Sequence, residues 1–395
     1  MVLETHPIQY HAPMYRLLQQ QLGIPVTAVY GSDFSVVGYR DPGFGTTFAW
    51  DTDLLSGYEV KFLSRVAAGS APVVGRIRPR GLGRILSEAK PRAVLLVGYG
   101  PLFHQLAFLQ VLRFGCPILL RCEARDRLKA GRPASPWYQD WLLRRFYRRC
   151  AGILYIGQRA QEHFKRLGVE DAKLVFSPYG VDRTSFQWDE AARLRWRQAA
   201  RAELGIEEGK TAILFSGKLL PAKGVELLVG AVKGFPPELR ERMILLFMGS
   251  GESQQRLARS AAAPPAIQVR FLGFKNQTEM SRYYHAADLL GFPSRSETWG
   301  LVVNEALHHG LPCVVSDSVG CAPDLVEEGA TGEIFETGSE GSLAAAIQRV
   351  LNLVGRPEIR EKCRQRVSSY TPERAAEGIA RAYRAVLHDG GDSGA

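Results

Sequence analysis

Two glutamates, Glu297 and Glu305, stand with seven residues between them in the segment FPSRSETWGLVVNEALHHGLPCVV. The segment predicts a buried strand that ends at Phe292, a loop that carries Glu297, and a helix opened by Gly300, with Glu305 about one turn in. A carboxylate accepts two hydrogen bonds from vicinal hydroxyls, and backbone N–H groups near Gly300 to Val302 can meet a phosphate at the helix start. The pattern favours a site for sugar hydroxyls and phosphate. The alternative, a capping Glu297 and a solvated Glu305, leaves the turn between them unexplained.

Two lysines, Lys218 and Lys223, flank a turn before a helix predicted at 225–232. Free N–H groups and the dipole at a helix start favour an anion. The lysines add charge, so a diphosphate suits this arrangement, whereas the alternative is two solvent-exposed lysines in a loop. The run GSGE at 249–252 follows another predicted strand. Its Gly251 can bring backbone close to a ligand, or the run is only a tight strand-to-helix turn.

Two glycine pairs test for a dinucleotide-binding fingerprint. The run GYG at 98–100 follows a predicted strand, but Phe103 stands at the third glycine position, and Gln254 stands there after the GSG at 249–251. Neither completes G-x-G-x-x-G, which disfavours a nicotinamide enzyme.

A metal site is not predicted. Asp51 and Asp53 form a D-x-D pair, which can hold a divalent cation against a diphosphate. The next residues, LLSGY, indicate a loop rather than a strand end, so we favour a surface turn. The six cysteines and eight histidines show no zinc spacing, and the cysteines are expected to be thiols in a reducing cytoplasm.

Short apolar runs alternate with helical patterns along the chain, which predicts an α/β fold with parallel sheets covered on both faces. Buried strands are expected at 26–30, 93–97, 117–121, 152–156, 212–216, 244–248, 269–272, 289–292 and 312–316. Helices are expected, among others, at 13–22, 137–150, 158–167, 188–204, 225–232, 301–309 and 372–387.

The chain of 395 residues is 46% hydrophobic and 23% charged, an ordinary globular balance. A single core seldom grows beyond roughly 250–300 residues, so two domains are expected. We expect two doubly wound, Rossmann-like domains at 1–180 and 181–370 that face a central cleft. A C-terminal helix at 371–387, packing back on the first domain, and a flexible tail at 388–395 complete the expectation.

The net charge of +10 is unevenly distributed. Between positions 121 and 150, nine lysines and arginines face three acids, and aromatic residues accompany the arginines of the helix expected at 137–150. A basic, aromatic helix can lie on an anionic membrane surface, and the alternative is a solvated helical face. Nucleic acid fits less well, because no recognisable nucleic-acid module accompanies the charge.

The motifs resemble those of the retaining glycosyltransferases of family 4, which have two Rossmann-like domains in the GT-B arrangement. Their hallmark is a glutamate, seven residues and a second glutamate, inside a stretch similar to PSRSETWGLVVNEALHHGLPCVVSD. The resemblance extends over nearly the whole chain. It includes THPIQYHAPMYRLL, YIGQRAQEHFKRLGV, PYGVD, FSGKLLPAKGVELLVGA, FMGSGE, FLGF, YYHAADLLGFPS and VGCAPDLVEEGATGEIF.

The resemblance implies roles for residues of the second half. Glu305 would hold the ribose hydroxyls, Glu297 the sugar hydroxyls beside the anomeric carbon, and Phe274 would lie where the base is contacted. The donor diphosphate would be bound by Gly217, Lys218, Lys223, Gly251 and the helix start formed by Gly300, Leu301 and Val302. Lys218 stands where arginine is common, which keeps the charge but loses a bidentate fork.

The first half departs from the family in places. The usual glycine-rich turn after the first strand is replaced by THPIQY at 5–10. Glu123 stands where many relatives have a histidine near the transferring sugar, and the alternative is a salt bridge to Arg121 or Arg125. In the second half, Cys321 stands where a second glycine often follows Gly320. The acceptor side is expected to include His6, Gln9, His11, Tyr99 and Arg121.

The resemblance implies transfer of a hexosyl or other sugar from a UDP-, GDP- or ADP-sugar to an acceptor hydroxyl, with retention and without a cofactor. The acceptor is expected to be a glycan, lipid-linked or small molecule in cell-envelope or exported-polysaccharide assembly. Because Glu4 and His6 interrupt the N-terminus and no long apolar run follows, a cytoplasmic protein is expected, held at the inner face of the plasma membrane where the basic helix binds lipid. The alternatives are a catalytically silent nucleotide-sugar-binding or scaffold protein and a nucleic-acid-binding protein.

Overall fold

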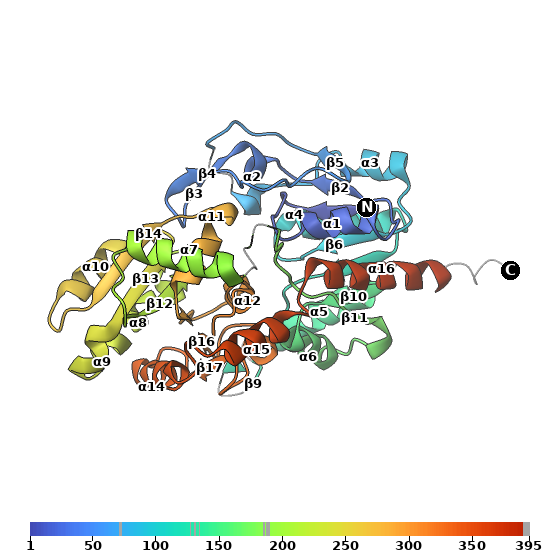
Figure 1. Cartoon of the computed structure of the whole chain (residues 1–395). Helices are drawn as coiled ribbons and strands as arrows, with labels where there is room; N and C mark the ends of the chain where they lie inside the picture. The colour runs from blue at the N-terminus through green and yellow to red at the C-terminus, as the bar shows by residue number, and fades with distance from the viewer. Residues whose placement is uncertain are drawn as a thin grey trace. The chain divides into compact units, whose positions relative to one another are not determined.

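The computed structural model describes residues 1–70, 73–126, 128–129, 132–133, 135–184, 186 and 190–389. The tail expected at 388–395 lies outside the described residues from position 390 onward, as do Arg127 of the basic segment and Trp188 at the start of an expected helix. The chain forms two compact units (Figure 1). Unit 1 contains Met1–Arg40, Thr47–Asp182 and the residues from Tyr370 onward; unit 2 contains Asp41–Thr46 and Arg183–Ser369. The grouping of Asp41–Thr46 with unit 2 was not expected from the sequence.

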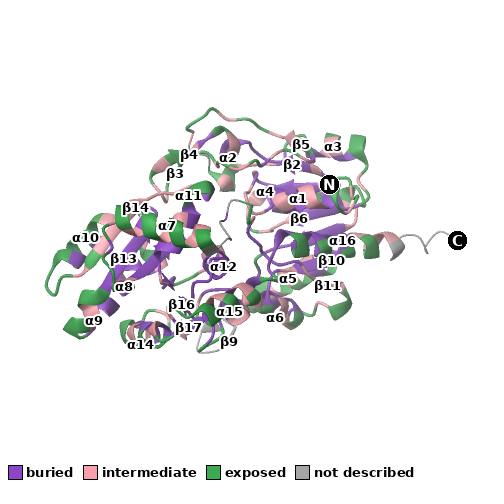
Figure 2. Ribbon diagram, viewed as in Figure 1, coloured by how far each residue is buried: buried purple, intermediate pink, exposed green. Residues whose placement is uncertain are grey.

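Unit 1 is built on a parallel sheet of seven strands in the order β11-β10-β7-β6-β1-β2-β5. Its strands are largely purple in Figure 2, because the apolar runs that form them are buried. The strands are β1 (Val2–Glu4), β2 (Thr27–Tyr30), β5 (Glu59–Phe62), β6 (Val94–Val97), β7 (Ile118–Arg121), β10 (Gly152–Tyr155) and β11 (Leu174–Phe176). Two short pairs lie apart from this sheet: β3 (Tyr39–Asp41) with β4 (Thr46–Phe48), and β8 (Leu128–Lys129) with β9 (Arg132–Pro133).

Helices complete unit 1, and the last of them comes from the far end of the chain. Helix α16 packs against α1 and against β10 and β11, and its residues Ala375 and Ile379 share a buried cluster with Met14 and Leu18. The helices are α1 (Ala12–Gln20), α2 (Phe34–Val37), α3 (Leu82–Ala89), α4 (Leu102–Arg113), α5 (Trp137–Arg148), α6 (Gln158–Arg166), α16 (Pro372–Asp389) and the 3-10 turns η1 (Val74–Arg76) and η2 (Asp171–Lys173).

Unit 2 contains a parallel sheet of six strands in the order β14-β13-β12-β15-β16-β17. The strands are β12 (Thr211–Ser216), β13 (Met243–Met248), β14 (Gln268–Gly273), β15 (Leu289–Phe292), β16 (Cys313–Ser316) and β17 (Gly332–Phe335). The helical segments are α7 (Glu190–Glu203), η3 (Pro221–Lys223), α8 (Val225–Lys233), α9 (Pro237–Arg242), α10 (Gln254–Ala262), α11 (Gln277–Ala286), α12 (Leu301–His308), α13 (Ala322–Leu325), α14 (Glu340–Leu351) and α15 (Pro357–Val367). In both units the strand order reverses near the middle, the topology of a doubly wound fold.

No described helix is both long and apolar enough to cross a membrane.

Candidate functional site

The site residues of unit 2 follow the carboxyl ends of β12, β13 and β15. The turns after β12 and β13 lie in contact: the amide of Gly217 donates to Met248 O at 2.9 Å, and that of Leu219 donates to Ser250 O at 2.9 Å. A Cβ at Gly251 would meet Leu219 O at 2.4 Å, so only glycine fits there. Gly251 therefore packs against protein backbone, as in the tight turn that was the alternative interpretation of this run.

Lys223 ends the turn η3 and lies beside the loop after β15. Its ammonium forms an ion pair with Glu297 Oε2, and it also lies over the Phe292 ring, 5.7 Å from the centroid. The chain can approach this closely because Gly224 has no Cβ, which would otherwise meet Pro293 O at 2.2 Å. The structure thus brings together a lysine and a glutamate that are 74 positions apart in sequence.

Helix α12 begins directly after this loop. Gly300 has a φ of +103°, a conformation that glycine adopts without strain, and the helix runs from Leu301 to His308. The first N–H groups of a helix have no acceptor within the helix, and at α12 these groups belong to Leu301 and Val302. The loop is fixed from the other side, because Gly320 N donates to Glu297 O at 3.0 Å.

Glu305 is fully buried, with 0% of its surface exposed. Its Oε2 accepts a hydrogen bond from the Tyr284 hydroxyl at 2.6 Å. Its backbone carbonyl oxygen lies 2.7 Å from His309 Nδ1, and burial holds the pKa of His309 well below its usual range. The alternative of a solvated Glu305 is therefore wrong. Tyr284 and His309 were not singled out from the sequence, although the run YYHAAD that carries Tyr284 was.

Lys218 contacts the short segment of unit 2 that comes from the first half of the chain. Its Nζ lies 2.9 Å from Asp41 Oδ1 and 5.1 Å from the centre of the Phe44 ring. Phe44 in turn meets Phe274 edge to face, with ring centroids 5.0 Å apart. Asp41 and Phe44 were not predicted as site residues, because nothing in their local sequence indicates a partner nearly 180 positions away.

The carboxyl ends of β1 and β7 in unit 1 carry a buried polar network. His11 Nδ1 lies 2.5 Å from Glu4 Oε1, and His11 Nε2 lies 3.3 Å from Arg121 Nη1. Arg121 is only 1% exposed; it also donates to Pro178 O at 2.7 Å and lies over the Tyr179 ring. His11 and Arg121, expected on the acceptor side, thus bond to groups of their own unit, and Glu4 was missed although it ends a strand.

The remaining predicted residues of unit 1 differ in how far they are buried. Glu123 is exposed. The pKa of Tyr179 is raised well above its usual value, chiefly by the burial of Tyr179 itself and also by the charge of Glu123. Gln9 is half-buried, and burial lowers the pKa of His6 to about 4. Tyr99 contacts the Phe146 ring at 5.6 Å.

Asp53 lies in an exposed turn, where its Oδ1 accepts from the amides of Leu55 and Ser56 at 3.0 and 3.1 Å. The surface turn favoured for the D-x-D pair is what the structure has at this position. Within the described ranges, no three or more histidine, cysteine, aspartate or glutamate side chains are grouped so that they could hold a metal ion.

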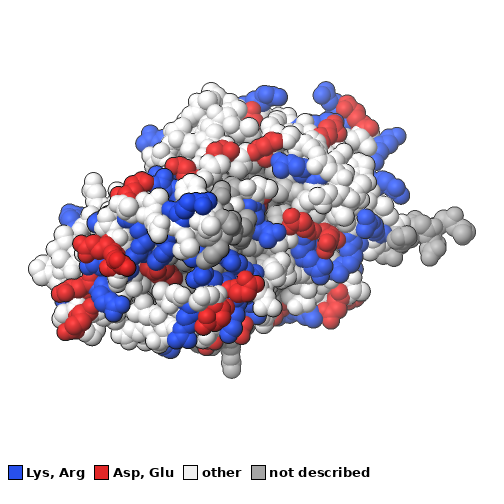
Figure 3. All heavy atoms as spheres, in the orientation of Figure 1, with Lys and Arg blue, Asp and Glu red and all other residues white. Residues whose placement is uncertain are grey.

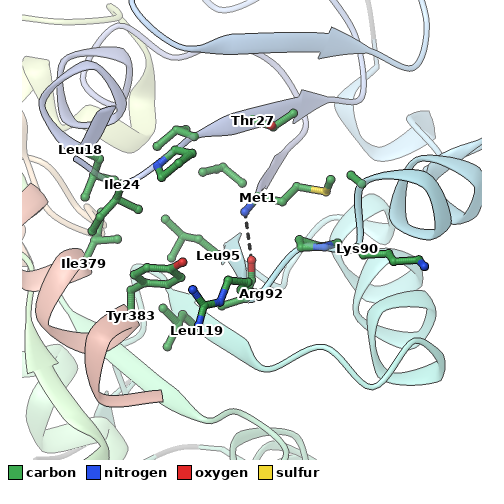
Figure 4. Close-up of a pocket in the computed structure, with 16 residues that line it drawn as sticks. Met1, Leu18, Ile24, Thr27, Lys90, Arg92, Leu95, Leu119, Ile379 and Tyr383 are labelled. Carbon is green, nitrogen blue, oxygen red and sulfur yellow. Dashed lines mark hydrogen bonds between the residues drawn. The ribbon is translucent and has the colours of Figure 1, made fainter. Parts of the chain in front are cut away.

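A cavity of about 260 Å³ lies at the opposite, amino edge of the unit 1 sheet (Figure 4). It is lined by Met1 and Thr27 at the strand starts and by Leu18, Ile379 and Tyr383 of α1 and α16. Ligands of open α/β sheets bind at the carboxyl ends of the strands, and none of the residues singled out from the sequence lines this cavity. It is therefore not the candidate site.

Comparison with known proteins identifies the class of this fold. The structure is similar to sucrose-phosphate synthase from Thermosynechococcus elongatus, with a TM-score of 0.70 and 16% identity over 98% of this chain and 100% of that one. It is also similar to HepE of Anabaena in complex with UDP and glucose, with a TM-score of 0.67 and 16% identity over 97% and 99% of the two chains. The chain therefore has the GT-B fold of two Rossmann-like α/β domains.

Two family models define the chain further. The model for glycosyl transferases group 1 matches residues 197–370, and the model for a glycosyl transferase 4-like domain matches residues 31–180. The two matches together span most of the chain, which therefore belongs to the glycosyltransferases that these two models describe. A curated relative, the D-inositol 3-phosphate glycosyltransferase of Geodermatophilus obscurus, is 30% identical over 239 residues, 58% of this chain and 51% of that protein. The matched region thus spans about half the length of this relative.

Proposed function

We propose that this protein transfers a hexosyl or other sugar from a nucleotide diphosphate-sugar to an acceptor hydroxyl, with retention at the anomeric carbon. The observation that carries the proposal is the ion pair of Lys223 with Glu297, set beside the amino end of α12. A cation and free helix amides suit a diphosphate, and a carboxylate suits sugar hydroxyls. Family membership supports the same chemistry.

In this proposal unit 2 binds the donor. Lys218, Lys223 and the first amides of α12 hold the diphosphate, Phe274 lies at the base, and Glu297 turns from Lys223 to the sugar hydroxyls when the phosphate arrives. Glu305 reaches the ribose hydroxyls only after the side chains that cover it open, because it is fully buried in the structure. Tyr284 fixes its carboxylate in the meantime.

Retention would follow from attack on the face that the diphosphate leaves, with the leaving phosphate accepting the acceptor's proton. No carboxylate nucleophile is then needed. The residues of unit 2 contribute by fixing the donor and by stabilising negative charge on the departing diphosphate. Lysines and helix amides can do this without a metal ion.

Unit 1 is the proposed acceptor side, and its candidate contacts are Glu123, His6, Gln9 and Tyr99. His11 and Arg121 would act by positioning, since their polar atoms bond within the unit. The curated relative is named for D-inositol 3-phosphate, which supports a phosphorylated acceptor here. A lipid-linked or soluble glycan of the cell envelope or of an exported polysaccharide is the proposed class.

Membrane contact is proposed for helix α5. Trp137 is 80% exposed and Trp141 51%, and Leu142 is exposed as well. The arginines at 144, 145, 148 and 149 are also exposed, and Arg145 lies over the Trp141 ring at 5.1 Å. Exposed aromatic rings beside arginines suit anionic headgroups, which would place the protein at the inner face of the plasma membrane. On the face seen in Figure 3, basic and acidic side chains lie interspersed.

The test is incubation with UDP-, GDP- and ADP-sugars, chosen by thermal shift, followed by NMR of the released or transferred sugar. Slow hydrolysis or transfer with the anomeric configuration kept would support the proposal. Binding without any turnover would favour a silent nucleotide-sugar-binding or scaffold protein, and an inverted product would contradict retention.

A further inference from the structure

The segment Asp41–Thr46, which reads DPGFGT, belongs to unit 2 and contacts the proposed donor residues. Asp41 is 7% exposed, and its two carboxylate oxygens lie 2.9 and 3.0 Å from Lys218 Nζ. Burial by itself would raise the pKa of Asp41, but the Phe44 amide and the Lys218 ammonium outweigh it and hold that pKa below its usual range. The ionised carboxylate of Asp41 therefore forms an ion pair with Lys218, the lysine proposed to bind a phosphate.

The turn that presents Asp41 is built by its own side chain. Asp41 Oδ1 accepts from the amides of Gly43 and Phe44 at 2.8 and 2.9 Å, the arrangement of an Asx turn. A Cβ at Gly43 would meet Lys218 Cδ at 2.6 Å, so the absence of a side chain lets the lysine lie along the turn. The glycine and the aspartate together fit this turn to Lys218.

An aromatic ring follows the carboxylate. Phe44 meets Phe274 edge to face at 5.0 Å, and its carbonyl oxygen accepts from Ser250 Oγ at 2.7 Å. Three groups of the proposed donor side thus each contact one group of the segment. The Lys218 ammonium pairs with the Asp41 carboxylate, and the Ser250 hydroxyl and the Phe274 ring contact the carbonyl and the ring of Phe44. A nucleoside diphosphate carries the same combination of anion and aromatic ring.

We propose that Asp41–Phe44 is an internal stand-in for the nucleoside diphosphate, which the donor displaces when it binds. The inference rests on the proposed donor site. Occupation of the site by the segment weakens donor binding, because the apparent affinity is the intrinsic affinity multiplied by the fraction of molecules in which the site is open. The Asp41 carboxylate competes with the diphosphate, and the Phe44 ring competes with the base.

Asp41→Asn is the sharpest test, because the amide oxygen still accepts from Gly43 and Phe44 while the charge is lost. Calorimetry with inorganic pyrophosphate and with UDP, GDP and ADP should show roughly tenfold tighter binding of pyrophosphate and of the preferred nucleotide. Phe44→Ala should increase the affinity for the nucleotide more than the affinity for pyrophosphate, because pyrophosphate has no ring to compete with Phe44. Asp171→Asn, which removes an exposed carboxylate paired with Lys165 at 2.8 Å, is the matched control and should change neither.

A second measurement does not depend on nucleotide binding. Acetylation of Lys218, followed by peptide mass spectrometry, should be several-fold faster in Asp41→Asn than in the wild type, because the freed amine is no longer paired. Unchanged reactivity, or nucleotide affinity that is unchanged or weaker in Asp41→Asn, would overturn the stand-in alone. Failure of every variant to bind any nucleoside diphosphate would contradict the donor site itself, and the stand-in with it.

Discussion

The hydroxyl of Tyr284 donates a 2.6 Å hydrogen bond to the carboxylate of Glu305, and both residues are fully buried. A buried carboxylate is costly unless hydrogen bonds compensate it. Tyr284, on α11, therefore holds in place the glutamate that we propose to bind the ribose, so loss of this hydrogen bond is expected to affect both the stability of unit 2 and donor binding.

Tyr284→Phe should lower the free energy of unfolding by about 1–3 kcal/mol, because it removes a hydrogen-bond donor from a fully buried acceptor. Nucleoside diphosphate affinity should fall as well. Urea denaturation and calorimetry measure the two effects. Tyr283→Phe, one position earlier, is the matched control: its ring packs under Lys275 and Arg282, and phenylalanine keeps that contact. Equal effects of the two variants would contradict a specific role for Tyr284.

Stability should depend on pH through His104. Burial lowers the pKa of this residue to about 4, and neither ring nitrogen has a hydrogen-bond partner in the part of the chain that the structure describes. Between about pH 6.5 and 4 the unfolded chain therefore binds a proton that the folded one does not, and stability falls as pH falls, by up to about 1.4 kcal/mol per unit.

His104→Leu should reduce the slope of unfolding free energy against pH by the contribution of about one proton taken up on unfolding. Urea denaturation across the same pH range measures that slope. Gln105→Leu, the next position of α4, removes an exposed polar side chain that does not titrate and should keep the wild-type slope. A His104→Leu slope equal to that of the wild type would show that the imidazole titrates normally in the folded protein.

The strands and the helix starts could be predicted from the sequence, because local pattern determines them. The expected strands match β2, β6, β7, β10 and the first five strands of unit 2 to within one residue at either end. The strands β1, β5, β11 and β17 were not expected. In β5 the polar residues Glu59 and Lys61 interrupt the apolar pattern, and β1 and β11 have only three residues each. Gly300 was recognised as a helix start from its position between a loop and an apolar run.

What the sequence could not predict are the partners of the charged groups. Arg121 bonds to Ser177 and Pro178, more than 50 positions away, and Lys218 pairs with Asp41 across 177 positions. Such pairs depend on the tertiary fold and leave no spacing in the sequence. The family resemblance named Lys218 and Arg121 but not the groups that engage them.

Catalysis should survive chelation. Lysines and helix amides can stabilise the leaving diphosphate, and Asp53 already uses its Oδ1 to cap an exposed turn. Sugar transfer in EDTA should stay near the untreated rate, and Asp51→Asn should have little effect. If EDTA abolishes transfer and manganese restores it, a metal ion is required, and Asp51 and Asp53 would again be candidates for binding it.

Helix α5 should bind anionic vesicles at low salt. Each basic residue near such a surface contributes about 1 kcal/mol, so changing four arginines to glutamine should abolish sedimentation with the vesicles, as should high salt. The variant carries Arg144→Gln, Arg145→Gln, Arg148→Gln and Arg149→Gln. The matched control changes four arginines of α9 and α10: Arg240, Arg242, Arg256 and Arg259. If the wild type does not sediment with anionic vesicles at low salt, the basic residues of α5 are only solvated, and a soluble acceptor is favoured.

Calorimetry on a single variant tests most directly whether unit 2 binds a nucleoside diphosphate through Lys223. Lys223→Ala should weaken binding of the preferred nucleotide by about 1.5–3 kcal/mol, the value of a charged hydrogen bond. Lys233→Ala, which removes the same charge from the far end of α8, should leave the affinity as in the wild type. An unchanged affinity in Lys223→Ala, or an equal loss in both variants, would contradict the donor site.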